Sequence, residues 1–145
     1  MGMYTELNCA FQLGKETPQK IVDILLFMVR VTGVEPVNLP SHTLFSTDRW
    51  DSMLITGSVY FKGDTHSTVR LDEDDEQYHV TIRTNFKNYQ GEVEKFLEWI
   101  TPYIDALDGD FIGYSRYEET EVPTLLYYPN RSFTPHVPEE ITDWQ

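Results

Sequence analysis

The sequence contains a single cysteine, Cys9, so no intramolecular disulfide can form. Chains without disulfides are typical of reducing compartments. Long apolar runs are also missing: the longest, residues 24–29, is far shorter than the roughly 20 residues that span a bilayer. The chain does not open on an apolar leader behind Lys or Arg. We therefore expect a cytoplasmic protein without a membrane segment.

Basic side chains are few. The 145 residues include 11 Lys and Arg against 24 Asp and Glu, which gives a formal net charge of −13. Direct binding to nucleic acid needs a basic surface that neutralises phosphates, so we expect none. An acidic surface instead favours solubility, attraction to basic partners or mimicry of a polyanion.

Catalytic signatures are missing as well. The sequence has no glycine-rich phosphate loop, no G-x-S-x-G, no H-E-x-x-H and no paired cysteines. The histidines at 42, 66, 79 and 136 do not show metal-ligand spacing. The acidic run at 72–76 does not match a calcium loop and predicts a solvated hairpin tip. We expect a protein that is not an enzyme and holds no cofactor or metal; the catalytic alternative would use His66 or His79 as a general base.

Periodicity predicts two helices and six strands in one domain, residues 1–145, with an irregular tail at 129–145. Thr17 and Pro18 are typical of a helix start, and Gly33 of its end. Asn88 is expected to cap a second helix over 90–105, kinked at Pro102. The predicted strands cover residues 3–13, 53–61, 67–71, 78–87, 111–117 and 124–128.

The predicted order, β-α-β-β-β-α-β-β, indicates an α+β fold: an antiparallel sheet with both helices on one face and the other face open. The strand over 78–87 is expected to be central. Val80, Ile82 and Phe86 share its apolar face, whereas His79 and Arg83 share its polar face. The broad apolar surface of the first helix and the aromatic tail also suggest a homo-oligomer.

Three of the few basic residues, Arg70, Arg83 and Arg116, fall on the polar sides of predicted strands. Guanidinium groups bind phosphate or carboxylate in bidentate fashion, and aromatic rings stack on a base. We therefore predict an anion-binding pocket on the open face or in the loop at 35–51. Its other expected residues are Tyr60, His79, Tyr114, Arg49 and Trp50. The alternatives are that the arginines form cross-strand ion pairs and that Trp50 packs the loop onto the core.

Three stretches carry a resemblance to known proteins: M-G-M-Y-T-E-L at the start, N-Y-Q-G-E-V-E-K-F-L-E-W-I at 88–100 and G-Y-S-R-Y-E-E at 113–119. They resemble uncharacterised small proteins of phages and other mobile elements. The resemblance implies stoichiometric action against host defence in the host cytoplasm, either by sequestering a nucleotide signal or by occluding a nucleic-acid site.

Together these patterns predict a non-catalytic binding protein that sequesters a small anionic, nucleotide-like ligand. The alternative is an acidic protein–protein inhibitor, or a nucleic-acid mimic, that blocks a basic host protein. Its surface would comprise the acidic run at 72–76 together with Glu118, Glu119 and Glu121.

Overall fold

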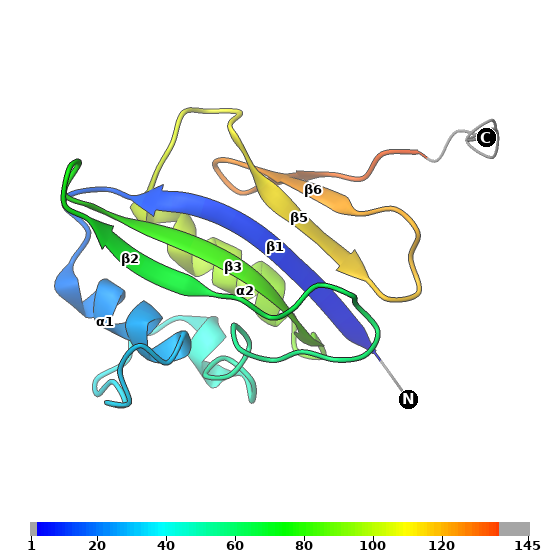
Figure 1. The fold of residues 1–145 in the computed structure, drawn as a ribbon, viewed down its shortest axis with the longest axis horizontal. Coiled ribbons are helices and arrows are strands. Elements are labelled where there is room, and N and C mark those ends of the chain that lie inside the picture. Colours follow the sequence, from blue (N-terminus) through cyan, green and yellow to red (C-terminus); the bar gives the residue numbers. More distant parts are fainter. Residues whose placement is uncertain (1–2, 137–145) are drawn as a thin grey trace.

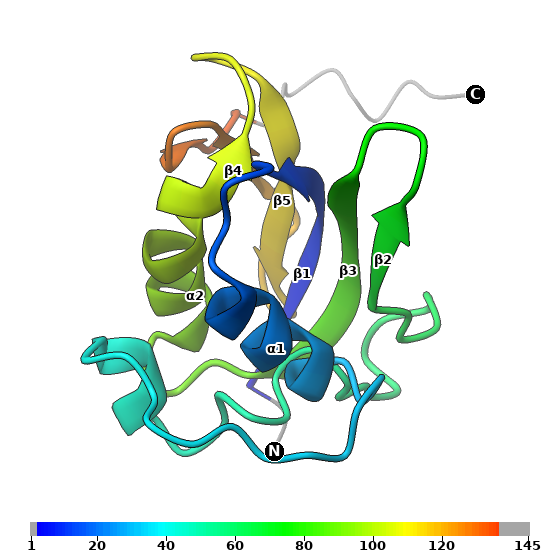
Figure 2. The same ribbon diagram turned by 90° about the vertical axis from the view of Figure 1, so that its left-hand side faces the viewer.

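A computed structural model describes residues 3–136 of the chain. It shows an antiparallel sheet of seven strands with two helices on the same side of it (Figures 1 and 2). The predicted α+β class is therefore confirmed. The strands are β1 Tyr4–Leu13, β2 Thr68–Asp72, β3 Gln77–Lys87, β4 Ile104–Asp105, β5 Phe111–Tyr117, β6 Thr124–Tyr127 and β7 Arg131–Phe133, and the helices are α1 Gln19–Met28 and α2 Glu92–Ile100.

The strands lie in the order β2-β3-β1-β5-β6-β7, and the short β4 pairs with the end of β1. β3 pairs with a strand on each side, as expected for the most regular stretch of the sequence. Its register with β1 runs without interruption from Tyr4↔Lys87 to Gln12↔His79. The sheet is thus built around β1 and β3, and this register decides which side chains become neighbours.

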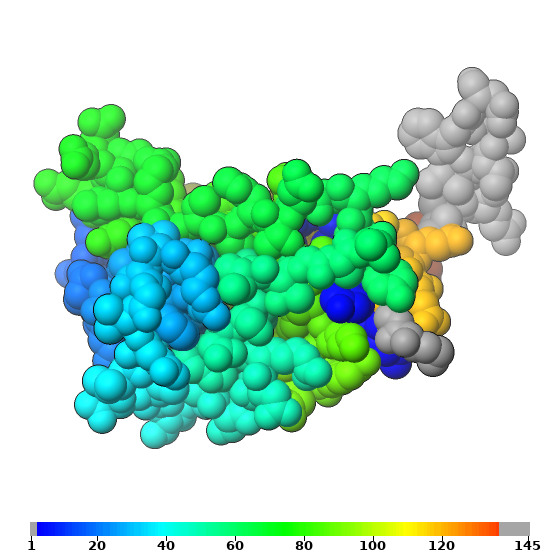
Figure 3. Space-filling model, turned by 60° about the horizontal axis from the view of Figure 1, so that its bottom comes forward, coloured from blue at the N-terminus to red at the C-terminus, as the bar shows by residue number. Residues whose placement is uncertain are grey.

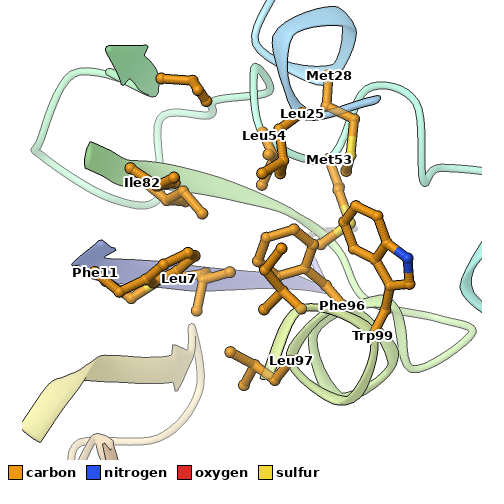
Figure 4. Packing of buried hydrophobic residues seen from close by; sticks show 14 of the residues in the cluster. Leu7, Phe11, Leu25, Met28, Met53, Leu54, Ile82, Phe96, Leu97 and Trp99 are labelled. Carbon is orange, nitrogen blue, oxygen red and sulfur yellow. The ribbon is translucent and has the colours of Figure 1, made fainter. Parts of the chain in front are cut away.

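The core lies between the sheet and the two helices (Figure 4). Alternate side chains of β1 and β3 enter it, and burial of each large one contributes roughly 1.5–3 kcal/mol. Both helices supply the opposing layer. Cys9 is one of the β1 side chains on the core face of the sheet, and burial raises the pKa of its thiol to about 12. The largest fully buried side chains are Leu7, Leu13, Ile24, Leu25, Met28, Leu44, Met53, Leu54, Ile82, Phe86, Phe96 and Ile100.

Helix α1 ends at Met28, earlier than the predicted stop at Gly33. Arg30 adopts a left-handed conformation with φ of 63°, and its backbone N–H donates to Phe27 O at 3.0 Å. Val31 N–H donates to Leu26 O at 2.9 Å, which completes a Schellman motif. The Arg30 guanidinium also donates to Phe27 O and Asp51 O. These bonds satisfy the last carbonyls and end the helix without a glycine.

The expected Thr17 cap is also absent, because the Thr17 hydroxyl donates to Gly14 O and Pro18 takes the N-cap position. Six positions of α1 are buried inside the chain: Ile21, Val22, Ile24, Leu25, Phe27 and Met28. This burial accounts for the breadth of its apolar surface, which the sequence alone linked to a homo-oligomer.

Helix α2 ends at Ile100 and does not continue to residue 105 as predicted. Pro102 lies in a single 3-10 turn, Thr101–Tyr103, and the chain then joins the sheet as β4. Proline lacks the N–H that a continuing helix needs, so the chain leaves the helix there. At the other end, Asn88 Oδ1 accepts from Val93 N–H at 2.9 Å, although Gly91 holds the N-cap position.

The segment at 53–61, predicted as a strand, is irregular. Its carbonyls bond to β3 side chains and backbone instead of to a regular ladder. The buried Thr84 hydroxyl donates to Met53 O at 2.6 Å and to Thr56 O at 3.0 Å, and Asn85 N–H donates to Thr56 O at 3.1 Å. Together with α1, the segment between α1 and β2 forms most of the surface seen in Figure 3 (blue through cyan to green).

Replacing the Thr84 hydroxyl tests this anchoring. We expect Thr84→Val to lower the free energy of unfolding by about 1–3 kcal/mol, because the Met53 carbonyl loses its donor inside the protein, whereas Thr56 O keeps Asn85 N–H. Thr81→Val is the matched control, since Thr81 lies on the exposed face of the same strand. Equal urea midpoints for the two variants would show that the hydroxyl does not anchor the segment.

The tail predicted as irregular from residue 129 begins with a hairpin. Asn130 has φ of 79° and forms the turn, and β7 pairs with β6 from Tyr127↔Arg131 to Leu125↔Phe133. The prediction was therefore wrong for residues 131–133. Asparagine tolerates this left-handed conformation well, which allows the chain to reverse directly after β6. The rest of the predicted tail, residues 137–145 with Trp144, lies outside the described residues.

Candidate ligand-binding site on the open sheet face

Polar side chains from three adjacent strands meet on the face of the sheet that the helices leave open. Asn8 lies opposite Arg83 of β3 on one side and Tyr114 of β5 on the other. Glu6 lies opposite Arg116 of β5. Residues directly opposite each other project to the same face of a sheet, so these five side chains share one surface.

These side chains form the floor of an open hollow of about 590 Å³. This volume lies within the usual range for small-molecule sites, about 300–1,000 Å³. A wall is supplied by residues 60–63, which we call the cover segment. In Figure 1 the green stretch leading into β2 crosses the N-terminal end of β1. The lining residues are Glu6, Asn8, Tyr60, Phe61, Lys62, Gly63, Arg83, Tyr114 and Arg116.

The hollow is positively charged within an acidic protein. Its three cations, Lys62, Arg83 and Arg116, face one carboxylate, Glu6, so its formal charge is +2 while that of the whole chain is −13. A concave site with a positive charge concentrates anions, whereas the net negative charge of the rest of the chain repels them. The arrangement therefore favours an anion at this place on the molecule.

A partly buried network around the buried Glu6 holds the floor in place. Glu6 is only 7% exposed, and its Oε1 lies 3.4 Å from Arg116 Nη2. Asn8 Nδ2 donates to Tyr114 Oη at 2.5 Å and to Glu6 Oε2 at 3.4 Å. The Arg116 guanidinium also lies over the Phe61 ring, 5.1 Å from its centroid. Arg116 thus forms a cross-strand ion pair with Glu6, which is the alternative that the sequence analysis gave for the strand arginines.

Arg83 differs from Arg116 because it forms no ion pair with a carboxylate within residues 3–136. Its Nε donates to the backbone oxygen of Asp64 at 2.6 Å. Gly63 lies directly beside this side chain, since a Cβ there would be in ordinary contact, 3.5 Å from Arg83 Cδ. No carboxylate among the described residues therefore offsets its charge, and this exposed side chain can offer its terminal nitrogens to an anion.

Arg70 and His79 share the open face but lie outside the hollow. They face each other across β2 and β3, four residues and therefore about 13 Å along β3 from Arg83. Arg70 pairs with Asp72 at 3.8 Å. His79 Nε2 lies 2.9 Å from Asp75 Oδ2, and this contact is the main cause that lowers the pKa of Asp75. The three strand arginines thus do not form one cluster.

The hairpin tip brings together the one group with metal-ligand geometry among residues 3–136. Ligand atoms of Asp72, Asp75 and His79 lie within 4.8 Å of one another. The His79–Asp75 hydrogen bond explains this closeness without an ion, and the Arg70 cation beside Asp72 opposes a second positive charge.

Arg49 and Trp50 lie on the helical side of the molecule. The Trp50 ring packs against Phe45 at 5.0 Å and Phe27 at 6.1 Å, so it fixes the loop at 35–51 onto the core. Arg49 lies over the Tyr89 ring at 5.1 Å and within 4.0 Å of the buried Glu92 carboxylate. Neither residue lines the hollow.

The two acidic segments of the inhibitor interpretation lie at opposite ends of the sheet. The tip at 72–76 adjoins the Gln12 end of β1, whereas Glu118 bonds to Tyr4 at the other end. The ten residues of β1 separate them by about 30 Å. They do not form one continuous surface.

Sequence reasoning missed five of the lining residues: Glu6, Asn8, Phe61, Lys62 and Gly63. Glu6 and Asn8 follow the polar alternation of the first strand, which was a usable signal for their face. Their position beside Arg116 and Arg83 depends on strand register, which alternation does not give. Phe61 and Lys62 reach the site through the irregular cover segment and carry no sequence signal for it.

Comparison of the chain with family models, curated proteins and solved structures finds no match. The resemblance to phage proteins and the function therefore remain predictions. Within the part of the chain that the structure describes, no helix combines the length and apolar character needed to cross a bilayer.

Proposed function

We propose that this protein is a non-catalytic binding protein that captures a small anionic, nucleotide-like ligand in the hollow. The proposal rests on one observation. Two arginines and a lysine share a hollow of about 590 Å³ with the rings of Tyr60, Phe61 and Tyr114, on a chain of net charge −13. Cations for a phosphate and rings for a base are the two features that nucleotide binding requires.

Within this site Arg83 is the principal anion-binding residue. Its open terminal nitrogens offer the planar fork that fits phosphate oxygens, and Lys62 adds a mobile point charge. Tyr60 is 49% exposed, so its ring is accessible for stacking. Arg116 supports the floor through Glu6 and Phe61.

In the cell, we propose, the protein acts stoichiometrically by sequestering a nucleotide signal in the host cytoplasm, as a phage-type anti-defence protein. The resemblance of residues 1–7, 88–100 and 113–119 to phage proteins supports this role. One of these stretches supplies both Tyr114 and Arg116 of the hollow, and another supplies Glu6.

Charge reversal at Arg83 tests the proposal. We expect Arg83→Glu to weaken binding of nucleoside monophosphates at least tenfold, because a charge-assisted bidentate contact, worth about 1.5–3 kcal/mol, becomes a repulsion. Titration calorimetry and ligand-induced thermal shifts measure the change.

Arg70→Glu is the matched control. It makes the same charge change on the same face, but Arg70 is exposed and outside the hollow. The control is expected to bind as the wild type does. Equal losses in both variants, or a wild type that binds none of the monophosphates, would exclude capture in this hollow.

The exposed hairpin tip favours a second candidate function, in which the protein blocks a basic host protein. Glu73, Asp74 and Glu76 are exposed there, and Asp74 N–H donates to Asp72 Oδ1, which fixes the turn. This function predicts salt-sensitive binding to a basic protein that persists in Arg83→Glu. Capture instead predicts that ultraviolet-absorbing material co-purifies with the wild type and not with this variant.

A further inference from the structure

The floor of the hollow contains buried polar atoms without a hydrogen-bond partner among residues 3–136. They are Glu6 Oε1, Asn8 Oδ1 and Arg116 Nε. Arg116 Nη2 lies 3.4 Å from Glu6 Oε1 as an ion pair, yet no hydrogen bond joins them. An unsatisfied buried polar group costs about 1–3 kcal/mol, so three in one place indicate a missing interaction.

The chemical types of these atoms are fixed by their neighbours. Asn8 Nδ2 already donates to Tyr114 and Glu6, so the Asn8 atom left over is the acceptor Oδ1. A carboxylate such as Glu6 only accepts, and Arg116 Nε only donates. The floor therefore offers two acceptors and one donor.

We propose that the hollow is selective for guanine nucleotides. On its pairing edge guanine carries two neighbouring donors, N1–H and the 2-amino group, and one acceptor, O6. This set complements the two acceptors and the donor of the floor. Adenine carries one donor group and one acceptor on that edge, and uracil and cytosine each carry one donor group and two acceptors. Each of these bases offers one donor group to the two acceptors, so either Glu6 Oε1 or Asn8 Oδ1 would face a base atom that does not donate to it.

This selectivity rests on the proposed function, because the same ligand must place its phosphate on Arg83 and Lys62. With the guanine edge on Glu6 and Asn8, the exposed Tyr60 ring is available to stack on the base. One ligand then uses the cations, the rings and the unsatisfied atoms together.

Access to the three buried atoms of the floor requires the cover segment to move. Phe61 is 6% exposed and lies on the Arg116 guanidinium, so it covers this part of the floor. Next to the cover segment, the Asp64 carbonyl is bound by Arg83 Nε. A phosphate bound at the terminal nitrogens of Arg83 therefore lies directly beside the segment that has to open.

Titration calorimetry of the wild type with GMP, IMP, AMP, CMP, UMP and inorganic phosphate tests the proposal. We expect GMP to bind at least tenfold more tightly than AMP, CMP or UMP. IMP lacks only the 2-amino donor and is expected to bind about tenfold more weakly than GMP. This comparison needs no variant and therefore holds even if substitutions on the floor impair folding.

Glu6→Gln provides the second arm, because glutamine keeps the shape and removes the acceptor-only carboxylate. The ratio of GMP to AMP affinity should fall to about one, while dependence on Arg83 remains. Equal wild-type affinities for GMP, IMP and AMP, or a ratio unchanged by Glu6→Gln, would overturn guanine selectivity and leave nucleotide capture standing. Failure of every nucleotide to bind would overturn both proposals.

Discussion

Gly113→Ala is expected to prevent stable folding. Gly113 has φ of 154°, and a Cβ placed there would lie 2.0 Å from Asn8 O and 2.6 Å from Cys9 Cα. Both atoms belong to the backbone of β1, which pairs with β3 on its other side and cannot retreat. We expect the free energy of unfolding to fall by about 4 kcal/mol or more, measured by urea denaturation.

Gly33→Ala is the control for this prediction, since a Cβ there meets nothing within 4 Å. Its stability should stay within about 0.5 kcal/mol of the wild type. Closely similar midpoints for the two alanine variants would mean that β5 does not approach β1 as closely as described. The prediction matters for the site because this close approach sets Tyr114 beside Asn8.

Phe96→Ala is expected to cost about 3–5 kcal/mol of stability, the range for removing a fully buried aromatic ring. Phe96 is 0% exposed and lies between the sheet and Trp99, 6.0 Å from that ring (Figure 4). The loss combines transfer of the ring out of the core with the cavity left behind.

Phe111→Ala makes the same change at the exposed start of β5. Phe111 is 58% exposed and contacts the Tyr127 ring at 5.5 Å, so about 1 kcal/mol or less is expected. If chemical denaturation gave the two variants equal losses, the assignment of Phe96 to the centre of the core would be wrong.

The alternation of apolar and polar residues was sufficient to predict β1, β3 and β5, because one face of each strand packs against the helices. The same pattern gave a wrong prediction at 53–61, where the structure has no strand. Met53 and Leu54 are consecutive and both buried there, and the Met53 carbonyl is bound by the Thr84 hydroxyl instead of by the backbone of a neighbouring strand. β4 and β7 have two and three residues, too few to produce a periodic signal.

Part of the candidate site could also be predicted from the alternation of side chains along the strands. Arg83, Arg116 and Tyr114 project from regular strands, so their common face follows from period-two geometry. Period-two geometry does not give the separation of these residues along the strands, and the observed register places Arg70 outside the hollow. Tyr60 reaches the hollow through an irregular segment, so its inclusion depended on tertiary structure that no local pattern specifies.

The hollow differs in charge from the rest of the molecule. Glu6 neutralises part of the Arg116 charge, which leaves Arg83 and Lys62 as the net cations. The chain outside the hollow has a net negative formal charge, so we expect it to repel a nucleotide there. Its binding should weaken as salt screens this contrast.

Two-dimensional NMR of the labelled protein during a titration with GMP tests capture in the hollow most directly, since it locates the ligand without any substitution. We predict saturable shifts of the Asn8, Lys62 and Tyr114 amides and of Arg83 Nε–H, with little change at Arg70 or Trp50. Shifts confined to the hairpin tip at 72–76, or none that saturate, would contradict the account.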